Sequence, residues 1–295
     1  MTTSTRYQWL AVPALLLALT ACDQTGDDQT VDDQNATQDN VSSTASTTDT
    51  QDQQDGLSPT FVNRTITAPD CEGDDCASIE IHMIEFDNAP ELSRQLEQRL
   101  VRMGNPVSDS GIDEDNLPST VDTYAEGFFD QSARANEDTD NSSHYYASLE
   151  AEEVSRHDDL LILELKSHVM TGGAHGMPGT DYMVIDETTR QVVTLDDMLE
   201  EGQKPAFEAA LKDAWQDWQE NSEVGQTLDP INWPFSPSDN AAPLEDAMAV
   251  TYNVYDLGPY AIGQPTLTIP YSELEGVLKP RFVPESPATD APESR

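Results

Sequence analysis

Two histidines and one aspartate between residues 168 and 181 are the side chains best placed in this sequence to do chemistry. His168 falls in a run with strand character, and His175 falls in a glycine-rich segment. Imidazole can act as a general acid or base or can bind zinc, and Asp181 is a candidate third ligand. The alternative is that each histidine makes one local hydrogen bond, His175 with the backbone of its own turn. We expect no catalytic site, and His175 and Asp181 are the candidates should there be one.

Other catalytic patterns are missing from the sequence. It has no Gly-x-Ser-x-Gly motif, and the glycine-rich segment lacks the Lys and Ser/Thr of a phosphate-binding loop. Adjacent acids such as Asp158 and Asp159 are uninformative about a glycosidase pair in a chain with 56 acidic residues. Trp215, Trp218 and Trp233 could line a glycan groove or belong to a core. The sequence therefore predicts no enzyme, no metal site and no cofactor.

The N-terminus has the order of an export signal. An apolar run at residues 9–19 follows Arg6 and ends at Leu19, Thr20, Ala21 and Cys22. This order is typical of a cleaved signal, and the last four residues resemble the lipobox of bacterial lipoproteins. We therefore predict a signal peptide at 1–21 and lipid on Cys22, which would hold the protein on a membrane in the cell envelope, on the periplasmic side. An ordinary secretory signal is the alternative.

The position after Cys22 bears on which membrane holds the lipid. Asp23 occupies it, and an aspartate there resembles a signal for retention in the inner membrane.

Charge limits the choice of partners. The formal net charge is -42, with 14 basic against 56 acidic residues. Such a field argues against nucleic acid and anionic lipid as partners. One explanation is a halophilic, salt-adapted proteome, and the other is a surface that binds a cationic ligand. The acids are spread along the whole chain, which favours salt adaptation.

Two further cysteines lie close together. Cys71 and Cys76 are separated by four residues, three of them acidic. In an exported chain such a pair predicts a disulfide. A zinc site would require two further ligands with matching spacing, and none is adjacent.

Composition and periodicity delimit the folded part. Residues 22–59 form an acidic, polar segment that we interpret as a disordered tether, and residues 284–295 form a disordered tail. The spacing predicts helices at 90–103, 121–129, 194–199, 204–219 and 272–278, with Asn88 and a Ser119–Asp122 capping box at two starts. It predicts strands at 61–66, 79–86, 144–154, 160–170, 182–185, 191–195, 247–254 and 266–269. Residues 160–163 are apolar on both faces and predict a central strand, which follows a turn at 157–159. The fold class is therefore α+β with mixed or antiparallel sheets and packed helices.

The most distinctive motif combines the glycine-rich segment with the residues after it. The motif comprises Thr171, Gly172, Gly173, Ala174, His175 and Gly176, then Asp186, then the run 193–199. Together with 256–263 and 267–274, it resembles the C-terminal domain of the RsiV-like family, which is of unknown function. Residues 79–151 resemble the N-terminal subdomain of RsiV and PdaC proteins. The resemblance implies two sub-domains, at 60–155 and 156–283.

The family resemblance implies a role for the extracytoplasmic part alone. The anti-sigma segment and the deacetylase domain of these relatives have no counterpart here. What the resemblance implies is a binding module for a lysozyme-like muramidase, or for peptidoglycan. A cell-wall or acyl hydrolase with a site near His175 is one alternative, and a structural envelope lipoprotein is another.

Overall fold

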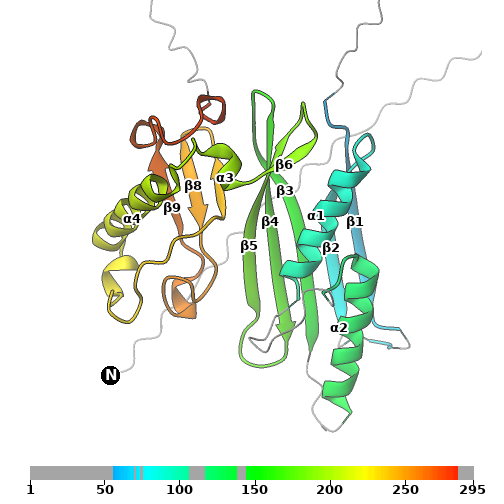
Figure 1. Ribbon diagram of the computed structural model, residues 1–295. Helices are drawn as coiled ribbons and strands as arrows, with labels where there is room; N and C mark the ends of the chain where they lie inside the picture. Colours follow the sequence, from blue (N-terminus) through cyan, green and yellow to red (C-terminus); the bar gives the residue numbers. More distant parts are fainter. Residues whose placement is uncertain (1–55, 70, 74–75, 106–116, 138–143, 285–295) are drawn as a thin grey trace, which may run out of the picture. The chain divides into compact units, whose positions relative to one another are not determined.

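The computed structural model describes residues 56–69, 71–73, 76–105, 117–137 and 144–284 (Figure 1). These residues all belong to one compact unit, Asp52–Arg295. The predictions for the signal peptide, Cys22, Asp23 and most of the tether lie outside the described residues. Within the described ranges, no helix combines the length and the apolar character needed to cross a membrane.

A six-stranded sheet forms the larger part of the fold (Figure 1). Its strands follow chain order, and every neighbouring pair is antiparallel except β2 and β3, which are parallel. Asp158, with φ 51°, turns β3 into β4, as the sequence predicts a turn there. The strands are β1 (Pro59–Thr67), β2 (Ser78–Phe86), β3 (Tyr145–His157), β4 (Leu160–Thr171), β5 (Met177–Asp186) and β6 (Gln191–Val193).

Strand β4 is buried on both sides. Leu161 and Leu163 belong to a hydrophobic cluster with the helices α1 (Pro90–Met103) and α2 (Val121–Asn136). Leu160 and Ile162 belong to a second cluster, with helix α4 (Lys204–Asn221) and a smaller sheet. Successive side chains of a strand point to opposite faces. The uninterrupted apolar run therefore supplies both cores, which confirms the prediction of a central strand.

The helices α1 (Pro90–Met103) and α2 (Val121–Asn136) connect β2 to β3. Both helices begin where they were predicted to begin, at residues 90 and 121, but both predicted capping residues are one position too early. Ala89 is the N-cap of α1, while the Asn88 side chain instead accepts from Ser58 N and donates to Gly56 O. Thr120 and Thr123 form the capping box of α2, because Ser119 lies one residue outside the first turn.

The second sheet is antiparallel, in the order β7 (Ala241–Pro243), β8 (Ala247–Thr251) and β9 (Thr266–Pro270). Helix α4 (Lys204–Asn221) packs Phe207, Leu211 and Trp215 into its cluster. The short helix α3 (Leu195–Met198) precedes α4.

Two expectations for this part of the chain are wrong. Strand β7 was not predicted, and the predicted helix at 272–278 is only a 3-10 turn at Tyr271–Glu273, with turns after it. Further 3-10 turns span Gly225–Thr227, Tyr260–Ile262 and Pro280–Phe282.

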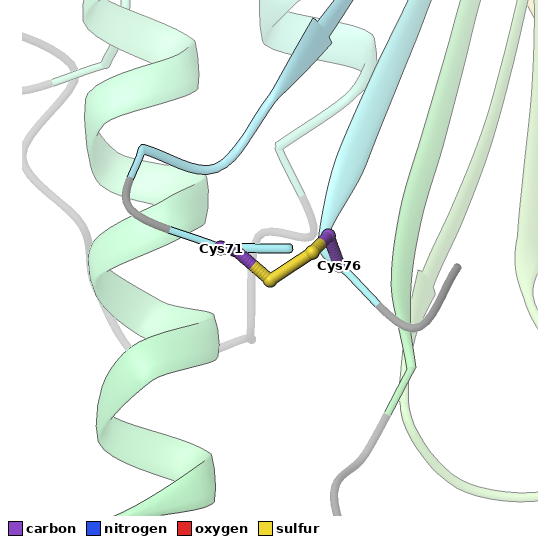
Figure 2. Close-up of a disulfide and its surroundings, with 2 residues drawn as sticks. All are labelled: Cys71 and Cys76. Carbon is purple, nitrogen blue, oxygen red and sulfur yellow. A yellow bond between two sulfur atoms is a disulfide. The ribbon is translucent and has the colours of Figure 1, made fainter. Parts of the chain in front are cut away.

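A disulfide closes the connection between β1 and β2 (Figure 2). It joins Cys71 to Cys76, with Cα atoms 5.8 Å apart. Cys76 is 6% exposed and lies at the entry to β2. The bridge therefore shortens the β1–β2 loop at its base.

The elements meet the definition of an α+β fold, which confirms the predicted class. Leu57 is 7% exposed and packs in the first cluster, so ordered chain begins inside the segment interpreted as tether. The proposed limit between residues 155 and 156 falls within β3, whose pairing with β4 continues on both sides of it.

Candidate functional site

The glycine-rich turn joins β4 to β5. Gly172 and Gly173 both have φ 89°, a conformation that favours glycine. Gly176 differs from them, since its φ is not in the left-handed range. A Cβ on Gly176 would instead overlap the ring of His168 and lie 3.1 Å from Val169 O. His168 therefore requires the absence of a side chain at residue 176.

His175 lies at this turn against a tyrosine from a distant loop. Its ring stacks on Tyr260, with centroids 3.9 Å apart and planes inclined by 23°. His175 Nδ1 lies 3.2 Å from Gly176 O, and the Tyr260 hydroxyl donates to the same carbonyl at 2.8 Å. The structure therefore favours the role of His175 as a residue that fixes its own turn.

The structure does not bring the three sequence candidates together. Asp181 forms an ion pair with Arg99 of α1, Nε to Oδ2 at 2.5 Å, and accepts from Tyr182 N. His168 lies beside Tyr146, with ring centroids 6.4 Å apart. Among the described residues, no three His, Cys, Asp or Glu side chains are grouped as a metal site would need.

A cavity of about 750 Å³ lies at the start of β5, directly after the turn. Met177 and Gly179 of β5, Met103 of α1, and Asn253 and Asp256 contribute to its walls. His175 does not line it. Its polar side chains are amides, carboxylates and the hydroxyls of Ser167 and Thr180, and no described imidazole or cationic side chain is among the residues that line it.

An exposed aromatic residue, Tyr255, comes directly before Asp256, which lines this cavity. Tyr255 is 47% exposed and has φ 73°, an uncommon conformation for a bulky side chain. Its ring centroid is 5.9 Å from that of Tyr260, which in turn carries His175. We call His175, Tyr255 and Tyr260 the aromatic loop surface. Met177, which is 40% exposed, follows His175 by two residues and lines the cavity.

Two asparagines hold the scaffold behind this surface. Asn253 Oδ1 accepts from Thr180 N at 2.7 Å and from Gln264 Nε2 at 2.8 Å. Asn240 accepts from Tyr182 N at 2.8 Å and donates to Thr180 O at 2.9 Å. Sequence reasoning missed both, because an isolated loop asparagine has no pattern that marks its partner.

These features define an α+β domain with two sheets and a loop-borne surface. A family model described as a protein of unknown function (DUF3298) matches residues 196–272. A solved DUF3298 family protein from Pseudomonas aeruginosa PAO1 is 30% identical, with a TM-score of 0.66, over 79% of this chain and 99% of the other. The chain belongs to the DUF3298 family.

A second solved structure supports the fold. It is a DUF3298 family member from Bacteroides fragilis NCTC 9343, 21% identical with a TM-score of 0.58, over 77% of this chain and 96% of that one. No protein of the curated collection matches this chain.

Proposed function

We propose that the protein is a lipid-anchored binding module of the cell envelope and that its aromatic loop surface engages a cationic, lysozyme-like muramidase. The observation that carries the proposal is Tyr255, an exposed aromatic side chain held at a strained backbone position. Strained residues cluster at functional sites because the surrounding structure must maintain them. Exposed tyrosines are also enriched among the residues that dominate protein interfaces.

Electrostatics supports a basic partner. With a net charge of -42, the protein attracts cations over the distance of a Debye length and repels phosphate-rich partners. Asp256 accepts a hydrogen bond from Asn253 N and lies next to Tyr255 in the chain. The resemblance to RsiV-like proteins independently suggests the muramidase, since that extracytoplasmic module binds lysozyme.

A binding role has more support than a hydrolytic one. A histidine base needs a nucleophile or water within reach and an orienting group. His175 stacks on Tyr260 and faces a carbonyl, and its ring forms no hydrogen bond with the carboxylate of any described residue. Peptidoglycan remains the ligand to compare with the muramidase, because aromatic rings also stack on sugars.

Anchoring is part of the proposal. The apolar run at 9–19 and Cys22 support a lipid anchor, and Asp23 supports retention in the inner membrane. Mass spectrometry of the protein from bacterial membranes should find diacylglycerol on Cys22, and Cys22→Ser should release the chain from the membrane fraction. A lipid-free mature protein would contradict the anchor without affecting the proposal for the surface.

The binding proposal is tested by calorimetry with the unit Asp52–Arg295 and a basic lysozyme. We expect binding at about 0.05 M NaCl that weakens at about 1 M, where the Debye length falls to about 3 Å. Tyr255→Asn keeps a residue that tolerates positive φ and should weaken binding at least about tenfold. Phe61→Ala removes an aromatic side chain that is 70% exposed on β1 and serves as the control.

Two results would contradict the muramidase proposal. One is the absence of binding at low salt, and the other is equal weakening by Tyr255→Asn and Phe61→Ala. Binding to purified peptidoglycan, lost in Tyr255→Asn, would assign the same surface to the glycan instead.

A further inference from the structure

Strand β9 lies at an open edge of the three-stranded sheet. Tyr252 N donates to Pro265 O at 3.0 Å, so in the antiparallel register the backbone of Pro265, Leu267 and Ile269 faces β8. Thr266, Thr268 and Pro270 then face outward. Pro270 fits this assignment, because proline is tolerated where the backbone nitrogen points away from the ladder.

The outward backbone groups of β9 are available. No described residue outside β8 forms a backbone hydrogen bond with Thr266 or Thr268. A free strand edge presents a row of donors and acceptors to which another extended chain can add. The edge of β9 is therefore competent for strand addition.

A groove with negative walls runs along this edge. Helix α4 contacts β9 (Figure 1), and a cavity of about 590 Å³ lies between them. Asp213 and Asp217 of α4 and Glu273 contribute carboxylates, and no Lys, Arg or His of the described ranges lines the cavity. None of the three carboxylates forms an ion pair with a described residue, whereas Asp181 pairs with Arg99.

We propose that this groove binds an extended, basic segment of another protein, which adds as a strand to β9. The backbone of the segment would pair with Thr266 and Thr268. Lysine or arginine side chains at alternate positions would reach the carboxylates on one side of the groove. The half-buried Trp218, which also lines the groove, offers a ring face for one of these cations.

The charge of the groove favours a basic partner over the chain's own terminal segments as the occupant. Residues 23–55 contain nine aspartates and no Lys or Arg, and residues 285–295 contain three acids and a single arginine. A second copy of the chain brings the same excess of acid, at a net charge of -42. Like charges across an interface are unfavourable, so the groove fits a basic partner in trans. This groove does not depend on the aromatic loop surface.

The test uses the unit Asp52–Arg295 and peptides about six residues long, the usual length of a strand. One peptide alternates lysine and valine, a second alternates glutamate and valine, and a third carries N-methyl groups on the backbone of the lysine–valine sequence. Calorimetry measures binding, and backbone amide NMR locates it. We expect the lysine–valine peptide to bind, with the largest shifts at Thr266 and Thr268, and both other peptides to bind at least about tenfold more weakly.

Matched variants separate the groove from the general charge. The combined change Asp213→Asn, Asp217→Asn and Glu273→Gln should weaken peptide binding about tenfold, as expected for the loss of three exposed ion pairs. The control removes the same charge elsewhere, with Glu85→Gln, Glu126→Gln and Glu137→Gln, and should change binding less than about twofold.

Thr268→Pro removes one outward N–H and should weaken peptide binding while leaving lysozyme binding intact. Equal binding of the N-methylated peptide, or equal effects of the two charge variants, would overturn the proposal. So would NMR shifts confined to residues outside the groove.

Discussion

Two sheet edges in this protein differ in whether their outward backbone groups are hydrogen-bonded. On β5, beyond the short pairing with β6, the backbone of Thr180 and Tyr182 is hydrogen-bonded by the side chains of Asn240 and Asn253. On β9, no described residue provides such a partner for the corresponding positions, Thr266 and Thr268. Side-chain amides carry the same donor and acceptor pair as a peptide group, so two loop residues can close an edge without a strand.

The difference shows where a partner strand can add. A closed edge contributes to the stability of the fold, because its hydrogen bonds are made within the chain. An open edge contributes little stability and keeps its donors for another molecule. Changes at the two edges should therefore differ in kind, with stability affected at β5 and binding at β9.

The largest effect is expected at Asn240. Asn240→Ala removes the bonds to Tyr182 N, Thr180 O and Thr251 O, and leaves buried backbone groups without partners. We expect a loss of about 3 kcal/mol in the free energy of unfolding by urea, from about 1–3 kcal/mol for each unsatisfied buried group. Asn232→Ala, on an exposed loop, is the control. A loss equal to that of the control would show that the β5 edge is not held closed by Asn240.

Asp186, at the end of β5, should have the next largest effect. It is 4% exposed and accepts from Thr189 N at 2.8 Å and from Arg281 Nη2 at 2.6 Å. Burial opposes its charge, but these two donors outweigh burial and lower its pKa. Asp186→Asn should cost about 2 kcal/mol at neutral pH, because charge-assisted bonds to a buried group are lost.

The lowered pKa of Asp186 determines how the stability difference between the wild type and Asp186→Asn changes with pH. A pKa lower in the folded state means that the stabilisation is complete above the unfolded value of about 3.9 and is lost as the pH falls through the folded value. The difference between the wild type and Asp186→Asn should therefore shrink below about pH 4 in urea unfolding. A difference that is constant with pH would show that the carboxylate charge is not responsible.

A smaller effect is expected at the turn that begins β5. Gly176→Ala places a methyl group against His168 and should cost about 1–2 kcal/mol in unfolding free energy, as overpacking usually does. In a His168→Ala background the cost should fall, and the double-mutant cycle measures that coupling. Equal costs in both backgrounds would place the strain at Val169 O instead.

The smallest change in stability is expected at the open edge. Thr268→Pro removes an N–H that faces outward, so no ladder hydrogen bond is lost and only the fixed φ of proline opposes folding. We expect a loss of about 1 kcal/mol or less in the unfolding free energy, measured by thermal unfolding. A loss of about 3 kcal/mol, as large as that expected for Asn240→Ala, would contradict the contrast between the two edges.

Most elements could be predicted from local patterns. The apolar run at 160–163 predicted a central strand, and the apolar spacing along 204–219 predicted α4. Strand β7, with the sequence Ala-Ala-Pro, is too short to show a period, so it could not be predicted. The helix expected at 272–278 failed because the chain there makes only one 3-10 turn before pairing Leu199 with Leu278.

The candidate site was predicted only in part. The glycine-rich turn and His175 stood out because glycines and a histidine are conspicuous in a sequence. Tyr260, which determines the position of the His175 ring, comes from a distant loop, and nothing in the sequence links the two. The edge-closing asparagines were missed for the same reason, since their role depends on tertiary contacts alone.

The single parallel pair in the larger sheet has a consequence for how the chain folds. Strands β3, β4, β5 and β6 follow one another as hairpins, and β1 and β2 form another. Only β2 and β3 must meet across an intervening pair of helices. Closing that long loop costs chain entropy before any contact compensates for it, and pairing of this kind is slow. We expect the two hairpin groups to form early, with their joining along β2 and β3 as the slow step of folding.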